Sequence, residues 1–366
     1  MAHPASEPPS KLGYLRTLSS RAGIHVSPLC LGAMSIGDQW SGLGSMDKEA
    51  SFKLLDAYYD MGGNFIDTSN NYQDETSEKF IGEWAEQRGI RDQLVIATKY
   101  SSNYKRAASD VVQKAQYAGN SIKSMYLSVE DSLKKLRTSY IDILYVHWWD
   151  WDTSVEEVMD GLHHLVAQRK VLYLGISDTP AWVVAQANTY AKCMGKTPFV
   201  IYQGLWNVKQ RDLERDILPM ARSFGLAIAP WGVVGQGKFR TEAENRRRAE
   251  QGETGRKFYS AGGSGQSEDD IRVSAALEKV ANELGAKNIN AVAIAYVLQK
   301  TPYVFPMIGG RKIEHLVANL EALDIDLSDE HMKYLEGIVP LDVGFPYTMI
   351  VSILLGSPCE GSADTI

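Results

Sequence analysis

Short, almost continuously apolar runs recur along most of the chain, and a longer segment with helical periodicity follows each of them. Near-continuous apolar character is typical of strands that are buried on both faces of a sheet. The eight runs are Leu29–Met34, Phe65–Ser69, Leu94–Lys99, Ile141–His147, Val171–Ser177, Val200–Trp206, Leu226–Gly232 and Val304–Gly310. The pattern therefore predicts an α/β protein with eight parallel strands.

The segments between these runs have the spacing of amphipathic helices. In Thr153–Gln168, apolar residues recur at positions i, i+3, i+4 and i+7. Ser154 with Glu157, or Thr153 with Glu156, offers a capping box at the start of this helix. Eight strand–helix pairs in about 300 residues match a closed (β/α)8 barrel, whose usual length is about 250 residues plus insertions. We therefore predict a TIM barrel, with a doubly wound sheet as the alternative.

Three segments depart from the repeat. Ser19–Gly23 is predicted to be the turn of a β-hairpin that precedes the first barrel strand and closes the bottom of the barrel. Ser101–Asn120 is a polar insertion after the third strand, and Lys238–Asp270 is a long insertion rich in Gly, Glu and Arg after the seventh. A loop of that length is usually functional or disordered, and closure over a bound cofactor is one hypothesis. Arg246–Arg248 within it reads as a solvated helix face, with nucleic-acid contact as the alternative.

The barrel is expected to span residues 12–340, between a flexible N-terminus over residues 1–11 and a tail over residues 341–366. The start of the chain is polar and rich in Pro, without the apolar core of a secretory signal. Residues 347–355 are apolar but too few to cross a bilayer, so we expect this segment to pack on the domain.

The composition narrows the classes of partner and compartment. The net charge of -7 comes from 38 basic and 45 acidic side chains and argues against a nucleic-acid partner, which needs a basic excess. A small-molecule or protein partner fits better, and no membrane partner is indicated. The three cysteines lack CxxC spacing, so we expect neither disulfides nor a metal site. A reducing compartment, the cytoplasm, fits this pattern.

Four ionisable side chains stand at the ends of three consecutive predicted strands: Asp67, Tyr72, Lys99 and His147. In a parallel barrel these ends form the active site. Lys99 would favour the phenolate of Tyr72 and lower a pKa that is ordinarily about 10. Asp67 would hold the charge of Lys99, and His147 would orient a substrate oxygen or relay a proton.

A tyrosine in such surroundings suits proton donation to a carbonyl oxygen while hydride arrives at the carbon, which points to a carbonyl reductase. Taken singly, each residue has a structural explanation, since Asp67 and Lys99 fit an ordinary ion pair and His147 fits a buried core histidine. Their position at three consecutive strand ends makes coincidence a poor explanation.

Five motifs follow one another along the chain: Phe65–Tyr72, Ile96–Lys99, Leu127–Leu136, Tyr140–Asp142 and Tyr145–His147. They resemble the signatures of the aldo-keto reductases, in that family's order and at compatible spacing over residues 12 to 340. By this resemblance the four residues are a catalytic tetrad with Tyr72 as the proton donor. Three further stretches, Trp148–Asp150, Gly309–Lys312 and Pro340–Pro346, resemble fungal aryl-alcohol dehydrogenases and norsolorinic acid reductases more closely.

The same resemblance implies a site for NADP(H) along the later strands. Ser177 and Gln203 match ligands of the nicotinamide carboxamide, and Trp231 stands where an aromatic ring stacks on the nicotinamide. Asp178 takes a position where the family usually has Asn; because a carboxylate cannot donate a hydrogen bond, it would turn away from the cofactor. The turn that follows is expected to approach the pyrophosphate through backbone amides and added charge. Its residues are Gly232, Gly235, Gln236, Gly237 and Lys238.

After the eighth strand, a basic segment opens a predicted helix. The amides and cations at such a helix start suit the 2′-phosphate of NADP, so NADPH is preferred over NADH. A helix whose first turn is basic by chance is the alternative. The resemblance adds that Asn319 lies near the adenine. The expected contacts are Gly310, Arg311, Lys312, His315 and Asn319.

Aromatic residues near the strand ends suggest a pocket that accepts a ring. The candidates are Trp40, Tyr100, Trp148 and Trp206, although some tryptophans are expected to pack under loops instead. The predicted function is NADPH-dependent reduction of an aromatic or polyketide-derived aldehyde or ketone. The alternative is an NADP-binding regulatory protein with little turnover, similar to channel β-subunits. A hydrolase or nuclease has little support, because no Ser/His/Asp constellation or carboxylate cluster is present.

Overall fold

The computed structural model describes residues 7–42, 44–251 and 265–350, and its centre is a ring of eight parallel strands. Neighbouring strands pair in parallel from β10 through β3 and on to β9, and a parallel bridge between Ile228 and Val304 joins the two ends of the sheet. All eight predicted strands are confirmed, and the alternative of an open sheet is excluded. They are β3 (Cys30–Gly32), β4 (Phe65–Asp67), β5 (Val95–Tyr100), β6 (Ile141–Val146), β7 (Val171–Ser177), β8 (Phe199–Leu205), β9 (Ala227–Trp231) and β10 (Met307–Ile308).

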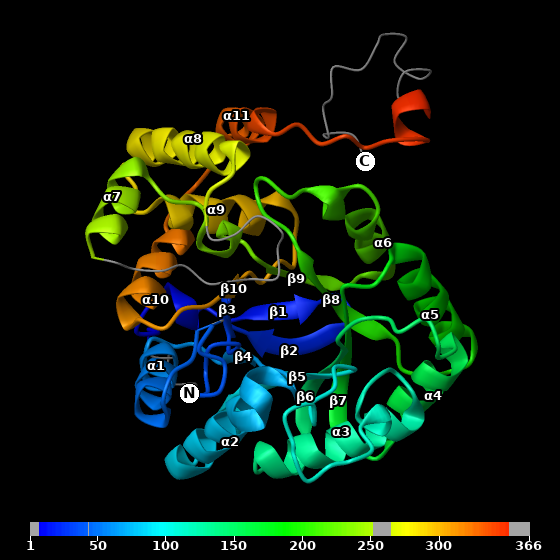
Figure 1. Ribbon diagram of the computed structural model, residues 1–366. Coiled ribbons are helices and arrows are strands. Elements are labelled where there is room, and N and C mark those ends of the chain that lie inside the picture. The colour runs from blue at the N-terminus through cyan, green and yellow to red at the C-terminus, as the bar shows by residue number, and fades with distance from the viewer. Residues whose placement is uncertain (1–6, 43, 252–264, 351–366) are drawn as a thin grey trace, which may run out of the picture.

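Helices surround this barrel on all sides (Figure 1). The layer next to the strands consists of α1 (Lys48–Asp60), α2 (Thr76–Arg88), α3 (Ile122–Lys135), α4 (Val155–Ala167), α5 (Ala181–Cys193), α6 (Ile217–Phe224), α9 (Ile289–Lys300) and α10 (Ile313–Leu320). Local signals in the sequence set their starts. Ser154 caps α4 by accepting a hydrogen bond from the amide of Glu157, which is half of the expected capping box. The carboxylate of Glu157 accepts from the amide of Ile122 instead.

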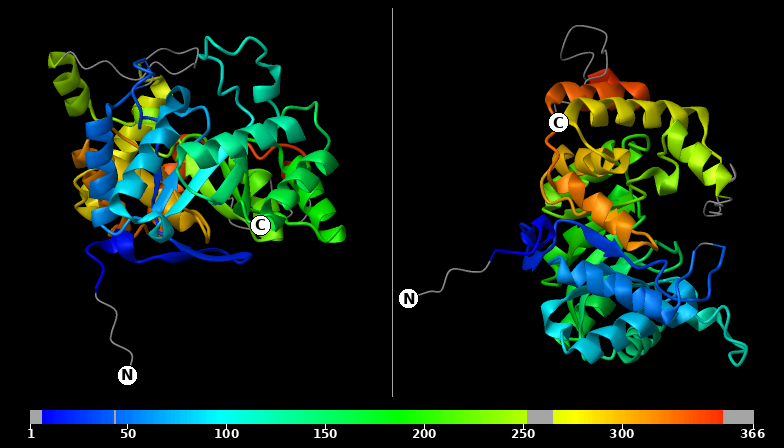
Figure 2. Two further views of the ribbon diagram at one scale, coloured as in Figure 1. Left: turned by 90° about the horizontal axis from the view of Figure 1, so that it is seen from below. Right: turned by 90° about the vertical axis from the view of Figure 1, so that its left-hand side faces the viewer.

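The predicted hairpin forms and closes one end of the barrel. It consists of β1 (Arg16–Ser19) and β2 (Ala22–Val26), which pair antiparallel. Leu18 and Val26 are fully buried and belong to the same apolar cluster as Phe65 and other residues inside the barrel. Figure 2 shows the hairpin at one end of the barrel and residues 101–120 at the opposite end. The apolar end is therefore sealed, and the carboxyl ends of the strands face the other side.

The long insertion is partly helical. Within it, α7 (Glu242–Glu250) buries no residue and pairs Arg246 with Glu242, so the solvated helix face is confirmed. The insertion was expected to reach Asp270, but α8 (Glu268–Leu284) already begins before that residue, because Ser267 and Asp270 form a capping box. Residues 252–264 of the insertion lie outside the described residues, so closure over a cofactor stays a prediction.

The chain ends of the described part lie on the outside of the barrel (Figure 1). After α11 (Asp329–Ile338), Arg215 fixes the beginning of the predicted tail by donating to the carbonyl oxygen of Asp342 at 2.6 and 3.0 Å. Residues 1–6 of the expected flexible N-terminus and 351–355 of the apolar segment fall outside the described residues. In the described part of that segment, Met349 and Ile350 are exposed, so the expected packing on the domain is not seen there. None of the helices in the described part combines the length and the apolar character that a bilayer crossing requires.

Candidate functional site

The carboxyl ends of β4 and β5 bring two oppositely charged side chains together inside the barrel. Asp67 is the last residue of β4, and Lys99 is the penultimate residue of β5. Both are buried, and the ammonium of Lys99 donates a short hydrogen bond to the Asp67 carboxylate. It also donates to the carbonyl oxygen of Thr68 at 2.7 Å and to the phenol oxygen of Tyr72 at 3.4 Å. All three ammonium donors are therefore used, and one of them points at the phenol.

The ion pair keeps a buried lysine charged. Burial alone would lower the pKa of Lys99, but Asp67 and Tyr72 together raise it above its ordinary value. Burial also raises the pKa of Asp67, and the nearby ammonium opposes that shift. Each of the two charges therefore depends on the other.

The pKa of Tyr72 differs from the sequence expectation. Burial raises this pKa above 10, and this effect outweighs the opposing influence of Lys99. Lys99 does lower this pKa, as expected, but burial raises it more, and the sequence did not reveal how completely the phenol is desolvated. The phenol is protonated at neutral pH, as a proton donor must be.

His147 lies beside the phenol, with the two ring centroids 6.0 Å apart. Its Nδ1 lies 3.3 Å from the hydroxyls of both Ser69 and Ser102. Burial, followed by the charge of Lys99, lowers its pKa to about 3. The imidazole is therefore neutral at physiological pH. It can orient an oxygen by hydrogen bonding, but it is not a cationic acid.

On the other side of the barrel, Ser177 and Gln203 stand opposite each other on β7 and β8. Gln203 donates to the Asp67 carboxylate at 3.0 Å and so joins the charged pair. Asp178 accepts hydrogen bonds from the indole N–H of Trp231 at 3.1 Å and from the hydroxyl of Ser177 at 3.3 Å. Its pKa is raised to about 6 by burial. The carboxylate thus fixes the orientation of the Trp231 ring, a contact that the sequence did not predict.

The glycine turn after β9 has the expected backbone but uses several of its own amides. Gly232, Gly235 and Gly237 all have positive φ, which glycine adopts without steric cost. The amides of Gly235, Gly237 and Lys238 donate within the turn. Three amides expected to face a pyrophosphate are therefore occupied. The side chain of Lys238 lies 4.0 Å from the carboxylate of Asp270, and Gln236 has a left-handed backbone in the same turn.

The start of α10 has the donor set that a phosphate requires. Lys312 is its N-cap residue and makes no side-chain capping hydrogen bond, so the N–H groups at the start of the helix point outward. The amide of His315 is used within the turn, because it donates to the carbonyl oxygen of Lys312. Arg311 and Lys312 are exposed beside them, and Gly310 and Asn319 line a small recess there. His315 is exposed on the same helix. Cations and uncapped amides together bind phosphate groups, so these residues fit the 2′-phosphate of NADP.

The four aromatic candidates separate into two groups. Trp40 lies edge-on to Tyr72, with ring centroids 6.2 Å apart, and Trp148 is 38% exposed and donates to Ser102. Tyr100 and Trp206 are fully buried, unlike the open rim position expected of them. The hydroxyl of Tyr100 donates to a backbone carbonyl and the indole of Trp206 donates to Glu214, so both have partners in the core.

Sequence reasoning missed several polar residues around the phenol. Ser69 and Ser102 contact His147, and Gln73 is fully buried directly after Tyr72. Lys135 on α3 is also buried, between the carboxylates of Glu75 and Glu78. Serines and glutamines in loops have no distinctive pattern. Lys135 carried a weak signal, because it occupies an inward position of an amphipathic helix.

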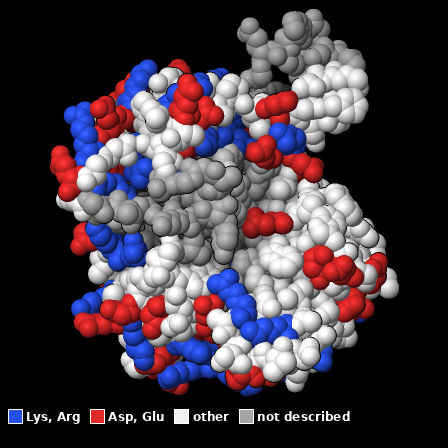
Figure 3. Space-filling model, in the orientation of Figure 1, with Lys and Arg blue, Asp and Glu red and all other residues white. Residues whose placement is uncertain are grey.

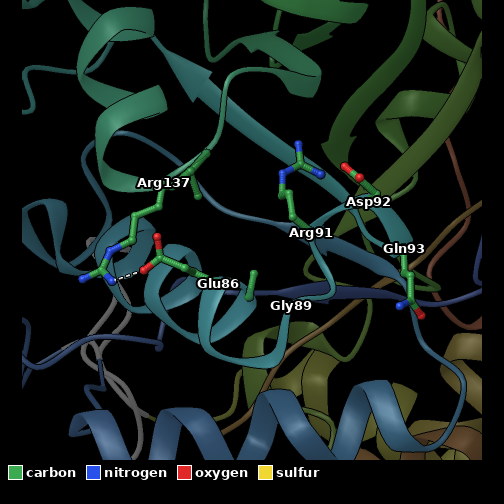
Figure 4. A pocket seen from close by; sticks show the side chains of 8 residues that line it. Glu86, Gly89, Arg91, Asp92, Gln93 and Arg137 are labelled. Atoms are coloured by element: carbon green, nitrogen blue, oxygen red, sulfur yellow. Dashed lines mark hydrogen bonds and ion pairs between the residues drawn. The ribbon is translucent and has the colours of Figure 1, made fainter.

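A second hollow lies at the opposite end of the barrel. It is a recess of about 460 Å³ between the end of α2 and the end of α3 (Figure 4). Arg137 pairs there with Glu86, and Arg91 pairs with the buried Asp142. Its cations are already neutralised, and it lies near the amino ends of the strands, so it does not compete with the site above.

Charge is unevenly distributed over the face that carries the site. Figure 3 shows basic side chains beside α10 and a largely uncharged surface, with acidic patches, over α4 and α5. An acidic chain that binds a polyanionic dinucleotide needs local positive charge. The basic side chains beside α10 supply it next to the uncapped helix start.

The family model of the Aldo/keto reductase family matches residues 28–340. An aryl-alcohol dehydrogenase [NADP(+)] of Phanerodontia chrysosporium is 64% identical over 350 residues, which cover 94% of this chain and 91% of that protein. The aldo-keto reductase ausK of Aspergillus calidoustus is 55% identical over 95% of this chain and 87% of its own length. Norsolorinic acid reductase B of Dothistroma septosporum is 51% identical over 94% of this chain and 86% of its own length.

Proposed function

Because this chain belongs to the aldo/keto reductase family and is an NADP-dependent oxidoreductase that reduces carbonyl groups, we propose that its substrate is an aromatic or polyketide-derived aldehyde or ketone. In this proposal Tyr72 donates the proton that completes the alcohol. The observation that carries the proposal is the continuous hydrogen-bonded chain from Asp67 through Lys99 to the phenol.

The proton step follows from the charges of these residues. The neutral phenol of Tyr72 donates its O–H to the carbonyl oxygen, and negative charge develops on the phenol oxygen as the proton leaves. The ammonium of Lys99, 3.4 Å away, stabilises that charge, and Asp67 keeps the ammonium in place. Neutral His147 orients the carbonyl oxygen. NADPH, when bound, supplies the hydride to the carbonyl carbon.

The cofactor contacts are part of the same proposal. Ser177, Gln203 and Trp231 would hold the nicotinamide end, and Asp178 would act beside it by orienting the Trp231 ring. The turn Gly232–Lys238 would follow the pyrophosphate. The adenosine phosphate would lie at the start of α10, against Gly310, Arg311, Lys312, His315 and Asn319.

The aromatic preference rests on Trp40 and Trp148 and on relatives named for aryl alcohols and norsolorinic acid. Both tryptophans adjoin the polar site, Trp40 through Tyr72 and Trp148 through Ser102. Flat apolar faces next to a proton donor suit a substrate whose carbonyl is attached to a ring. Tyr100 and Trp206 would act only by packing beneath this pocket.

The test is a screen of NADPH oxidation, followed by nicotinamide absorbance, over aromatic aldehydes, aliphatic aldehydes and polyketide ketones. We expect turnover of aromatic aldehydes, and we expect Tyr72→Phe to reduce kcat by about 10²–10⁴-fold without loss of NADPH binding. Tyr14→Phe, a change at an exposed tyrosine far from the site, is the control. Tight NADP binding without turnover of any carbonyl would support the regulatory alternative instead.

A further inference from the structure

The residue that follows the proposed proton donor has an unusual backbone. Gln73 is fully buried and has φ of 53°, and Asp74 and Glu75 are also left-handed, with φ of 45° and 81°. For residues with a Cβ this conformation costs on the order of 1–2 kcal/mol each. Three such residues in succession persist only where the surrounding structure holds them in place.

The side chain of Gln73 makes four hydrogen bonds, and all of them go to the loop between β3 and α1. Its carbonyl oxygen Oε1 accepts from the amides of Gln39 at 3.0 Å and Trp40 at 2.7 Å. Its amide nitrogen Nε2 donates to the carbonyl oxygens of Met34 at 2.8 Å and Gly44 at 3.1 Å. The loop therefore presents two N–H donors and two carbonyl acceptors to one side chain, and only a side-chain amide can pair with all four.

The loop approaches the turn so closely that it leaves no space for a larger residue at position 37. A Cβ on Gly37 would lie 2.5 Å from the Cβ of Gln73, and Gly37 has φ of +119°. Glycine at position 37 therefore allows the loop to lie against Gln73. The contact is specific in shape as well as in hydrogen bonding.

These bonds place Trp40 against the proton donor. The Trp40 ring packs against Tyr72 in a T-shaped arrangement, and the guanidinium of Arg106 lies over the Trp40 ring, 4.8 Å from its centroid. Arg106 in turn pairs with Asp74 at 3.1 Å. The indole thus contacts both the phenol of Tyr72 and Arg106 of the first insertion, and Gln73 fixes the backbone from which the indole projects.

We propose that Gln73 is a positioning residue that determines substrate specificity. By holding residues 34–44, it makes Trp40 one wall of the carbonyl pocket next to Tyr72. This inference rests on the proposed function, since it names the residue that shapes the pocket for an aryl carbonyl. Gln73 itself touches neither substrate nor cofactor.

The test uses Gln73→Gly, because glycine accepts the left-handed backbone and removes the side chain that makes the four bonds. We expect kcat for a small aliphatic aldehyde to stay within about threefold of wild type, since Tyr72 keeps its place. We expect KM for an aromatic aldehyde to rise about tenfold or more, a loss of about 1.4 kcal/mol in binding. Equal changes for both aldehydes would overturn the proposal.

A double-mutant cycle with Trp40→Phe checks that Gln73 acts through the indole. The combined variant should show little further rise in KM beyond the larger single effect, whereas full additivity would overturn the proposal. Gln299→Ala is the matched control, because its amide holds another loop through Ile325 and Leu327, far from the site. This control should leave both aldehydes unaffected.

One readout does not need activity. Acrylamide quenching of Trp40 fluorescence is obtained by subtracting the signal of a protein with Trp40→Phe from that of the same protein with Trp40. This quenching should be greater in the Gln73→Gly background than in wild type, because the loop that carries Trp40 is no longer held. Unchanged quenching would overturn the role of Gln73 even if every carbonyl is reduced. A wild-type protein that reduces no carbonyl would instead overturn the proposed function, and the quenching result would still decide whether Gln73 holds the loop.

Discussion

The two ends of the barrel are built from the same strands but have opposite character. At the hairpin end, Phe65 packs with Leu18 and Val26 in a fully apolar cluster. Two residues further along β4, Asp67 pairs with Lys99 in a buried polar network. Apolar burial stabilises one end, whereas desolvated charges at the other end require exact partners. We infer that the barrel separates stability from chemistry along its axis.

The largest effect is expected from Lys99→Met, which removes the cation at the polar end of the barrel. The change leaves Asp67 as a buried carboxylate without its cation, which costs about 3–5 kcal/mol of unfolding free energy. Carbonyl reduction should also fall by about 10²–10⁴-fold, because the phenolate that forms on Tyr72 loses its stabilising charge. Urea unfolding and NADPH oxidation measure the two effects.

The double variant Asp67→Asn with Lys99→Met separates these effects. It removes both charges, so it should recover much of the lost stability but none of the activity. Recovery of activity, or no recovery of stability, would show that the ion pair does not have the role assigned to it.

At the opposite end, Leu18→Ala should lower the unfolding free energy by about 2–5 kcal/mol, because it leaves a cavity in the apolar cluster. In the folded protein, kcat should stay unchanged. A marked loss of kcat at a temperature where the variant is fully folded would show that the two ends are coupled.

A smaller effect is expected at the start of α10. Arg311→Ala with Lys312→Ala should raise KM for NADPH about tenfold or more and leave KM for NADH nearly unchanged, because only NADPH carries the 2′-phosphate. Arg246→Ala, at an exposed arginine of α7, is the control. Equal effects on NADPH and NADH would rule out phosphate recognition by this pair.

The smallest effect concerns Asp178, whose pKa is raised to about 6 by burial. Above that pH the side chain is a carboxylate, and below it the side chain is a neutral acid. A negative charge near the cationic nicotinamide of NADP⁺ attracts it, so the affinity for NADP⁺ should increase a few-fold as the pH rises through about 6. Asp178→Asn should remove this part of the pH dependence. Fluorescence titration with NADP⁺ measures the affinity of both proteins at each pH. The phosphate of the ligand also changes its protonation in this range, but it does so equally with both proteins, so its contribution cancels when the two pH profiles are compared. Identical pH profiles would contradict the prediction.

The sequence by itself determined the eight strands, the hairpin and the four ionisable residues at the strand ends. It could do so because buried strands have continuous apolar runs, and because residues at the ends of parallel strands meet in any closed barrel.

Only the tertiary structure decided how these residues are surrounded. Desolvation reverses the expected pKa shift of Tyr72. Packing places Tyr100 and Trp206 in the core and leaves Trp148 at the surface. The four bonds of Gln73 join two loops that lie some thirty residues apart in the chain. Burial and long-range hydrogen bonds depend on which segments meet in space, and no local pattern in the sequence encodes that meeting.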